Sequence, residues 1–198
     1  MASVTVVGWH PAATGEDGPR LRLDWRRFSY AGKFTMTNTG KAVIREGEDD
    51  PENEFDESVV AAVAFNEDRT DEDALWLRYV TVREDRRGEG LGPELCATVA
   101  ARALDRGYER VWIAVNNPFA YEALYKAGFG FTGRKTGLAE LVLERPSDGD
   151  GECYRRGLDR FRDRELSTPE QRFLDGRTVP PGRDSSARDP SIRDPDDR

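Results

Sequence analysis

The sequence predicts an α/β fold, and three observations lead to this prediction. Residues 75–82 have the β-branched and aromatic density of a buried strand, and they run into a turn at residues 88–92 that contains three glycines. After this turn, apolar residues recur every four positions, as on one face of a helix: Leu91, Leu95, Val99 and Ala103. Residues 110–115 then form a second buried strand. This order describes a crossover unit whose ligand lies at the carboxyl ends of the strands.

The N-terminal third supplies the strands expected to complete the sheet. Strands are predicted at residues 3–9, 41–45 and 58–65, which are rich in β-branched side chains. Between the first two, a turn is expected at residues 15–19 and one or two short helices between Leu21 and Met36. The strongly acidic residues 46–57 predict an exposed loop.

The C-terminal part begins with a helix at residues 120–127 that ends at Gly128, and residues 138–143 supply a last strand. Residues 153–166 predict an amphipathic helix. From residue 179 onward Pro, Gly, Ser, Asp and Arg dominate, which predicts disorder. We therefore expect a main domain at residues 1–146, a helical extension at 147–178 and a disordered tail at 179–198.

Composition excludes several classes of function. A net charge of −8 argues against nonspecific binding to DNA or RNA. No apolar run approaches the ~20 residues that cross a membrane, and no secretory signal precedes the first strand, so a cytoplasmic location is expected. Lysine is scarce beside arginine and carboxylates are abundant. This bias fits a salt-adapted acidic surface or a GC-rich genome, and the two explanations are compatible.

Metal and nucleophile chemistry is not expected. The chain has two cysteines, Cys96 and Cys153, and one histidine, His10. This set lacks the spacing of a zinc site and the members of a Ser-His-Asp triad, so we predict no metal ligand.

The glycine turn is a candidate anion site. Glycines let a ligand approach the backbone, and the start of a helix offers unpaired N–H groups at the positive end of its dipole. The spacing Gly88-x-Gly90-x-Gly92 differs from the dinucleotide fingerprint, and Arg134 replaces the lysine that a P-loop at residues 128–136 needs. Arg86 and Arg87 favour a pyrophosphate over the alternative, a plain strand-to-helix connection.

Two motifs together resemble the GCN5-related N-acetyltransferase (GNAT) superfamily. Residues 87–92, Arg-Gly-Glu-Gly-Leu-Gly, match its motif Arg/Gln-x-x-Gly-x-Gly/Ala, and residues 117–129 are similar to its Asn…Leu-Tyr…Gly-Phe helix with an Asn-to-Tyr interval one residue longer. The resemblance covers roughly residues 59–143. It implies a mixed, largely antiparallel central sheet with a splayed strand pair and flanking helices. It also implies an N-acyltransferase that uses acetyl-CoA as donor.

The resemblance also implies roles for individual residues. Backbone groups of Val80 and Val82 would bind the pantetheine arm, although both side chains are also candidates for the core. The pyrophosphate would lie on the turn, so the implied donor-binding set is Arg87, Gly88, Glu89, Gly90, Leu91, Gly92 and Asn117. Tyr125 would be the general acid that protonates the departing thiolate, because a phenol keeps its proton at neutral pH. The alternative is that Tyr125 only packs beside Leu124.

The acceptor is expected to be an amine that attacks the thioester directly. The resemblance implies an acceptor pocket built from residues 25–34 and 130–137, where four aromatic residues form either a wall for an amine or part of the core: Trp25, Phe28, Tyr30 and Phe34. An acidic surface would attract cationic acceptors. Residues 75–82 contain no carboxylate, so no general base is assigned. A homodimer is a further expectation. The alternatives are a non-catalytic acyl-CoA-binding module of the same fold and an interaction protein that works through its C-terminal tail.

Overall fold

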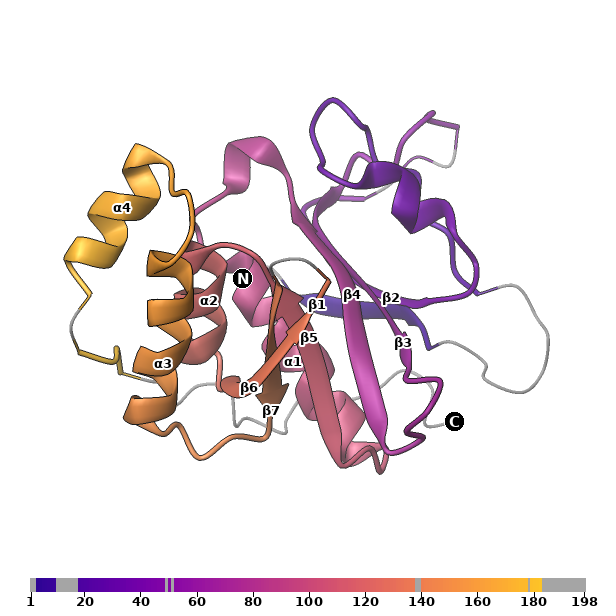
Figure 1. The fold of residues 1–198 in the computed structure, drawn as a ribbon. Coiled ribbons are helices and arrows are strands. Elements are labelled where there is room, and N and C mark those ends of the chain that lie inside the picture. Colours follow the sequence, from indigo (N-terminus) through magenta and orange to yellow (C-terminus); the bar gives the residue numbers. More distant parts are fainter. Residues whose placement is uncertain are drawn as a thin grey trace.

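The computed structural model describes residues 3–9, 18–48, 50, 52–137, 140–177 and 179–182 (Figure 1). Within these residues, seven strands form one sheet: β1 Val4–Gly8, β2 Gly40–Arg45, β3 Val59–Glu67, β4 Ala74–Val82, β5 Arg110–Val115, β6 Gly130–Thr136 and β7 Glu140–Arg145. Four α-helices accompany it: α1 Leu91–Asp105, α2 Pro118–Lys126, α3 Gly151–Arg162 and α4 Thr168–Asp175. Two short 3-10 helices, η1 Ala31–Thr35 and η2 Glu84–Arg86, lie in connections. The mixed, largely antiparallel fold predicted from the sequence is confirmed.

The strand order is β1-β2-β3-β4-β5-β7-β6, and β4 and β5 are its parallel pair. These two strands pair only from Ala74 to Leu77 on β4 and from Arg110 to Ile113 on β5. Beyond this point β4 continues along β3 to Val82, whereas β5 continues along β7 to Val115. The sheet therefore opens between the carboxyl ends of β4 and β5, as the predicted splayed pair requires.

The two faces of the sheet are covered by different parts of the chain. Helix α1 packs on one face, where Ala61 and Val63 of β3 join the main core. On the opposite face, Ala62 and Ala64 pack against the segment that precedes β2, mainly through its buried residues Leu21, Leu23, Phe28, Ala31 and Phe34. This alternation follows the two-residue period of a strand.

A buried lysine holds the segment between β1 and β2. Lys41 on β2 is fully buried, and its Nζ donates to the backbone oxygens of Pro19, Met36 and Thr39 and to Oγ1 of Thr39. Burial lowers the pKa of Lys41 to about 8. One side chain therefore satisfies three carbonyl groups of an irregular segment.

The structure differs from the predicted elements in three places. Of the one or two short helices predicted within residues 21–36, one is present as η1, and residues 21–30 are not helical; Tyr30 adopts a left-handed φ of 60° immediately before η1. Strand β6 and helix α4 were not predicted as elements. Gly130 and Gly133 weaken the strand pattern of β6. Most of the predicted turn at 15–19, the start of the predicted strand at 138–143 and residues 183–198 of the predicted tail lie outside the described residues.

The C-terminal extension packs on the rest of the chain. Helix α3 contacts β6 and α2, and α4 lies beside α2 (Figure 1). Four of their side chains are buried in the main core: Tyr154, Leu158, Phe161 and Leu174. The predicted extension at 147–178 thus shares the core of the main domain, and the division between the two stays a prediction. In the described part of the chain, no helix combines the length and apolar character needed to cross a membrane.

Candidate active site

The glycine turn joins η2 to α1 and exposes backbone groups. Gly88 and Gly90 adopt φ values of 87° and 83°, a region that favours glycine, and both are exposed. Gly90 is the N-cap of α1, and the N–H of Glu94 donates to its carbonyl as the first bond of the helix. The N–H groups of Leu91 and Gly92 therefore lie in the first turn, before intrahelical partners begin. This end of α1 can bind an anion.

The open edge of β4 begins directly beside this turn. The N–H of Arg83 donates to the carbonyl of Val60 on β3 over 2.9 Å. Because successive backbone groups of a strand point to opposite sides, those of Val80 and Val82 point away from β3, toward the opening between β4 and β5. A Cβ on Gly92 would lie 3.4 Å from Cγ2 of Val82 and 3.8 Å from Cγ1 of Val80. The helix start therefore lies against the open edge.

A groove of about 1360 Å³ runs from the glycine turn along α1 and α2. Small residues line it: Gly92, Ala97 and Ala101 on α1, Ala120 and Ala123 on α2, and Ala127, which caps the end of α2. Arg145 joins the two helices, because its Nη1 donates to the carbonyls of Ala97 and Ala127 over 3.1 Å each. The rest of the lining is apolar and charged, with cations such as Arg86 and Lys126, the carboxylates of Glu94, Asp105 and Glu122, and the ring of Phe119. The groove is large enough for an extended ligand that starts at the turn.

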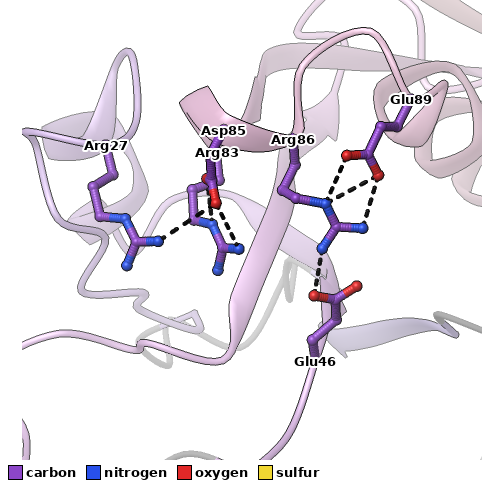
Figure 2. A network of polar contacts seen from close by, with 6 residues as sticks. All are labelled: Arg27, Glu46, Arg83, Asp85, Arg86 and Glu89. Carbon is purple, nitrogen blue, oxygen red and sulfur yellow. Dashed lines mark hydrogen bonds and ion pairs between the residues drawn. The ribbon is translucent and has the colours of Figure 1, made fainter.

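Arg86, which lines the groove, is compensated by two carboxylates (Figure 2). Its Nε and Nη2 donate to Glu89 at 2.8 Å, and its Nη1 donates to Glu46, which follows β2. Glu89 and then Glu46 raise the pKa of Arg86, and Arg86 in turn lowers the pKa of both carboxyl groups. An anion bound at the turn would therefore replace these carboxylates as the hydrogen-bond partner of the guanidinium group.

A second set of ion pairs connects the turn to the segment before β2. Asp85 accepts from Nε of Arg83 at 2.7 Å and lies 3.9 Å from Nη2 of Arg27 (Figure 2). Arg87 donates from Nη2 to Oγ of Ser29 at 3.0 Å. The side chain of Arg87 thus points toward this segment, although Arg87 also lines the groove. The glycine turn and the segment at residues 27–29 form one hydrogen-bonded unit.

Tyr125, the predicted acid, lies against the C-terminal extension. It is 4% exposed, its hydroxyl donates to the carbonyl of Gly149 at 2.8 Å, and its ring centroid lies 4.4 Å from that of Tyr154. Its neighbours Glu122, Ala123 and Lys126 line the groove, but Tyr125 is not among the lining residues. The structure therefore brings Tyr125 to α3 and does not bring it to the glycine turn.

Asn117 caps α2. Its Oδ1 accepts from the backbone N–H of Ala120 at 2.9 Å, the usual role of an asparagine before the first helical turn. Asn117 is also outside the groove lining, whereas Gly88, Gly90, Leu91, Gly92 and Val82 belong to it. The structure thus brings most of the predicted donor-binding residues to one groove and places Asn117 at its helical border.

The four aromatic residues predicted near the acceptor divide into two groups. Phe28 and Phe34 are buried in the core on the far face of the sheet. Trp25 and Tyr30 are 73% and 60% exposed, and the ring of Tyr30 lies 6.1 Å from that of Tyr79 on β4. Only the second group is accessible to a ligand.

The groove also contains residues that were not predicted as site residues, among them Phe119, Lys126 and Phe173. Residues 119, 123 and 126 recur at helical spacing, so the face that they share on α2 could have been found from the sequence. Phe173 had no such signal, because α4 was not predicted. Among the described residues, no group of three or more His, Cys, Asp or Glu side chains could hold a metal ion.

Comparison with solved structures gives matches at low identity. One is an N-acetyltransferase from Staphylococcus aureus Mu50, with 18% identity and a TM-score of 0.42 over 54% of this chain and 66% of that one. Another is described as IAA acetyltransferase from Bacillus cereus ATCC 14579, with 17% identity and a TM-score of 0.46 over 72% and 98%. A third is the PaiA N-acetyltransferase from Thermoplasma acidophilum in complex with coenzyme A, with 12% identity and a TM-score of 0.41 over 52% and 58%.

Comparison with curated proteins gave no match. Residues 19–131 match a family model described as the acetyltransferase (GNAT) family. This region includes β2 to β5, the glycine turn and the groove helices α1 and α2. Because the match covers more than half of the sequence, the chain belongs to the acetyltransferase (GNAT) family.

Proposed function

We propose that this chain is an acetyl-CoA-dependent N-acetyltransferase in which an amine attacks the thioester directly. The observation that carries the proposal is the open edge of β4 beside the glycine turn. A pyrophosphate on the turn and an extended arm along Val80 and Val82 would both be satisfied by backbone groups. Family membership agrees with acetyl-CoA as the donor.

Donor binding would use contacts that the turn already offers. The exposed glycines Gly88 and Gly90 allow the pyrophosphate to approach the backbone, and Arg86 would exchange Glu46 and Glu89 for phosphate oxygens. Glu89 and Leu91 would contribute their backbone groups only. Arg87 would hold the turn against the segment before β2 through Ser29. Bound acetyl-CoA supplies an activated acyl group in the form of its thioester.

The environments of the two cysteines favour direct attack over a covalent acyl-enzyme intermediate. The nitrogen of a neutral amine would form a bond to the thioester carbon and lose a proton to water, the carbon–sulfur bond would break, and the thiolate would take up a proton. A covalent intermediate on Cys96 is disfavoured, because this residue is fully buried and burial raises the pKa of its thiol to about 12. Cys153 donates its thiol hydrogen to the carbonyl of Phe131 on β6.

Tyr125 is our candidate for the acid that protonates the thiolate. To act in this way, its hydroxyl must leave the carbonyl of Gly149 and turn toward the opening of the sheet. Replacing Tyr125 by Phe should then lower the rate of thiol release at least tenfold while acetyl-CoA binding persists. Full turnover by Tyr125→Phe would remove Tyr125 from the mechanism.

The proposal also includes the acceptor, the location and the oligomeric state. The acceptor is an amine, and the exposed rings of Trp25 and Tyr30 are the candidates for holding it by a cation–π contact. The cytoplasmic location, the homodimer and the salt adaptation expected from the composition belong to the same proposal. Sedimentation of the purified chain at low and high salt would test the last two.

The second candidate is a non-catalytic acyl-CoA-binding module. It is favoured by the hydroxyl of Tyr125, which is engaged with Gly149 and faces the extension. Detection of free thiol over a panel of polyamines, aminoglycosides and lysine peptides separates the candidates. Thiol release that depends on an amine supports the transferase, and acetyl-CoA binding without release from any amine supports the module. Failure to bind acetyl-CoA would refute both.

A further inference from the structure

An aromatic pair lines the groove, and one of its two rings comes from the C-terminal extension. Phe119 on α2 and Phe173 on α4 both line the groove, with ring centroids 4.7 Å apart and ring planes inclined by 54°. Phe119 is 43% exposed. The family model ends at residue 131, so Phe173 lies outside the part of the chain that this model describes.

Specific contacts hold Phe173 in this position. Its helical neighbour Leu174 is fully buried in the main core. Arg177, which follows α4, donates to the buried carboxylate of Glu122 on α2 and lies 4.5 Å above the ring of Phe173. The same carboxylate also accepts from Nζ of Lys126 at 2.9 Å and from the hydroxyl of Tyr154 at 3.3 Å. The hydrogen bonds from Arg177 and Lys126 outweigh the effect of burial and lower the pKa of Glu122, so this ion pair is charged at neutral pH.

The position of the pair fits one part of the donor. Helices α1 and α2 follow the parallel strands β4 and β5, so their N-termini lie at the same end of the sheet. Phe119 lies in the first turn of α2 and Gly90 caps α1. In coenzyme A, the pantetheine arm and the adenosine leave the pyrophosphate in opposite directions. If the arm enters the opening beside Val80 and Val82, the adenosine must leave along the helix surface.

We propose that Phe119 and Phe173 form the subsite for the adenine of the donor, so that the C-terminal extension is part of the donor site. This inference rests on the proposed function. An adenine ring presents a flat π-face, and aromatic side chains bind such faces by stacking. Phe119 offers the more accessible ring, since it is 43% exposed, whereas Phe173 is partly buried and the guanidinium group of Arg177 lies over its ring. The neighbouring cations Arg177 and Lys126 are already paired with Glu122, so the contact is mainly apolar.

The subsite can be tested with two donors that share the thioester arm and its phosphate and differ only beyond that phosphate. Acetyl-CoA contains adenosine, whereas acetyl-phosphopantetheine has the same thioester arm and no adenosine. Calorimetric titrations of both are made with wild type, Phe173→Ala, Phe173→Leu and the control Arg172→Ala, an exposed position on the same helix. Phe173→Ala should weaken acetyl-CoA binding about tenfold, the equivalent of ~1.4 kcal/mol, and leave acetyl-phosphopantetheine binding unchanged.

Phe173→Leu keeps the apolar bulk and removes the aromatic face, so it guards against a loss of folding. It should melt within about 2 °C of wild type and still lose affinity for acetyl-CoA only. Unchanged acetyl-CoA affinity in both variants would overturn the subsite, and so would an equal loss for both donors. If wild type binds neither donor, the proposed function itself is refuted, which is a different result from failure of the subsite alone.

Discussion

Replacing Gly157 by Ala tests how the C-terminal extension packs on the rest of the chain. Gly157 lies in the middle of α3 and faces Tyr121 on α2. A Cβ at this position would lie 1.9 Å from Oη and 2.4 Å from Cζ of Tyr121, whereas real Cβ atoms essentially never approach within 3.0 Å. Tyr121 is fully buried, and its hydroxyl donates to the carbonyl of Tyr154. The substitution therefore moves α3 away from α2 or rotates Tyr121 away from its partner.

Two effects of opposite sign determine the result. Alanine inside a helix is favoured over glycine by about 1 kcal/mol. Overpacking of a core costs about 1–3 kcal/mol, and a buried hydroxyl that loses its partner costs about 1–3 kcal/mol more. We expect a net decrease of about 2 kcal/mol in the free energy of unfolding. For a chain of 198 residues this lowers the melting temperature by about 4–8 °C.

Thermal unfolding followed by circular dichroism measures this change. Gly32→Ala is the matched control, since its Cβ would meet no atom within 4 Å and its φ lies outside the left-handed region. The control should melt within about 2 °C of wild type. A melting temperature of Gly157→Ala equal to or above that of wild type would refute the packing of α3 on Tyr121.

The remaining predictions concern two buried charges. Lys41→Met should lower the free energy of unfolding by about 2–4 kcal/mol in urea denaturation, because three carbonyls lose their donor. Burial lowers the pKa of Lys41 from 10.5 to about 8, so between these pH values the native state binds fewer protons than the unfolded state. The stability of wild type relative to Lys41→Met should therefore rise from pH 8 to pH 10.5. A difference in stability that does not change with pH would contradict this prediction. Glu122 has a lowered pKa, so its stabilising effect is present above its ordinary value of 4.5 and is lost as the pH falls through the lowered value. Wild type should therefore lose stability relative to Glu122→Gln below pH 4.5, and parallel acid unfolding curves would show that the ion pair with Arg177 contributes nothing.

The sequence predicted the elements whose patterns are set locally. Strands β3, β4 and β5 are largely apolar, and the glycine turn has a spacing that local backbone geometry imposes. For residues 21–36 one or two short helices were predicted, and one short 3-10 helix is present at residues 31–35; the rest is irregular, because its apolar residues meet the far face of the sheet, which no local pattern reveals. The positive φ of Tyr30 has no sequence signal either.

The candidate site shows the same division. The glycine turn follows from adjacent residues, whereas the open edge of β4 was expected only from the family resemblance that the two motifs carry. The environment of Tyr125 depends on Gly149 and Tyr154, which approach it only when α3 packs on α2. Phe173 reaches the groove through the same long-range packing, held by an ion pair between residues 122 and 177. Contacts of this kind between distant segments lie beyond a reading of periodicity and motifs.

The most direct test of the account is a calorimetric titration of acetyl-CoA into wild type, Gly90→Asp, Gly90→Asn and Gly107→Asp. Positions 90 and 107 both have a left-handed φ and open space for a Cβ, so the backbone strain is matched, and Asn tests size without charge. We predict that wild type and Gly107→Asp bind alike, that Gly90→Asn binds more weakly, and that Gly90→Asp binds weakest because its carboxylate opposes the pyrophosphate. Equal binding by wild type and Gly90→Asp, or no binding by wild type, would contradict the assignment of the glycine turn as the donor site.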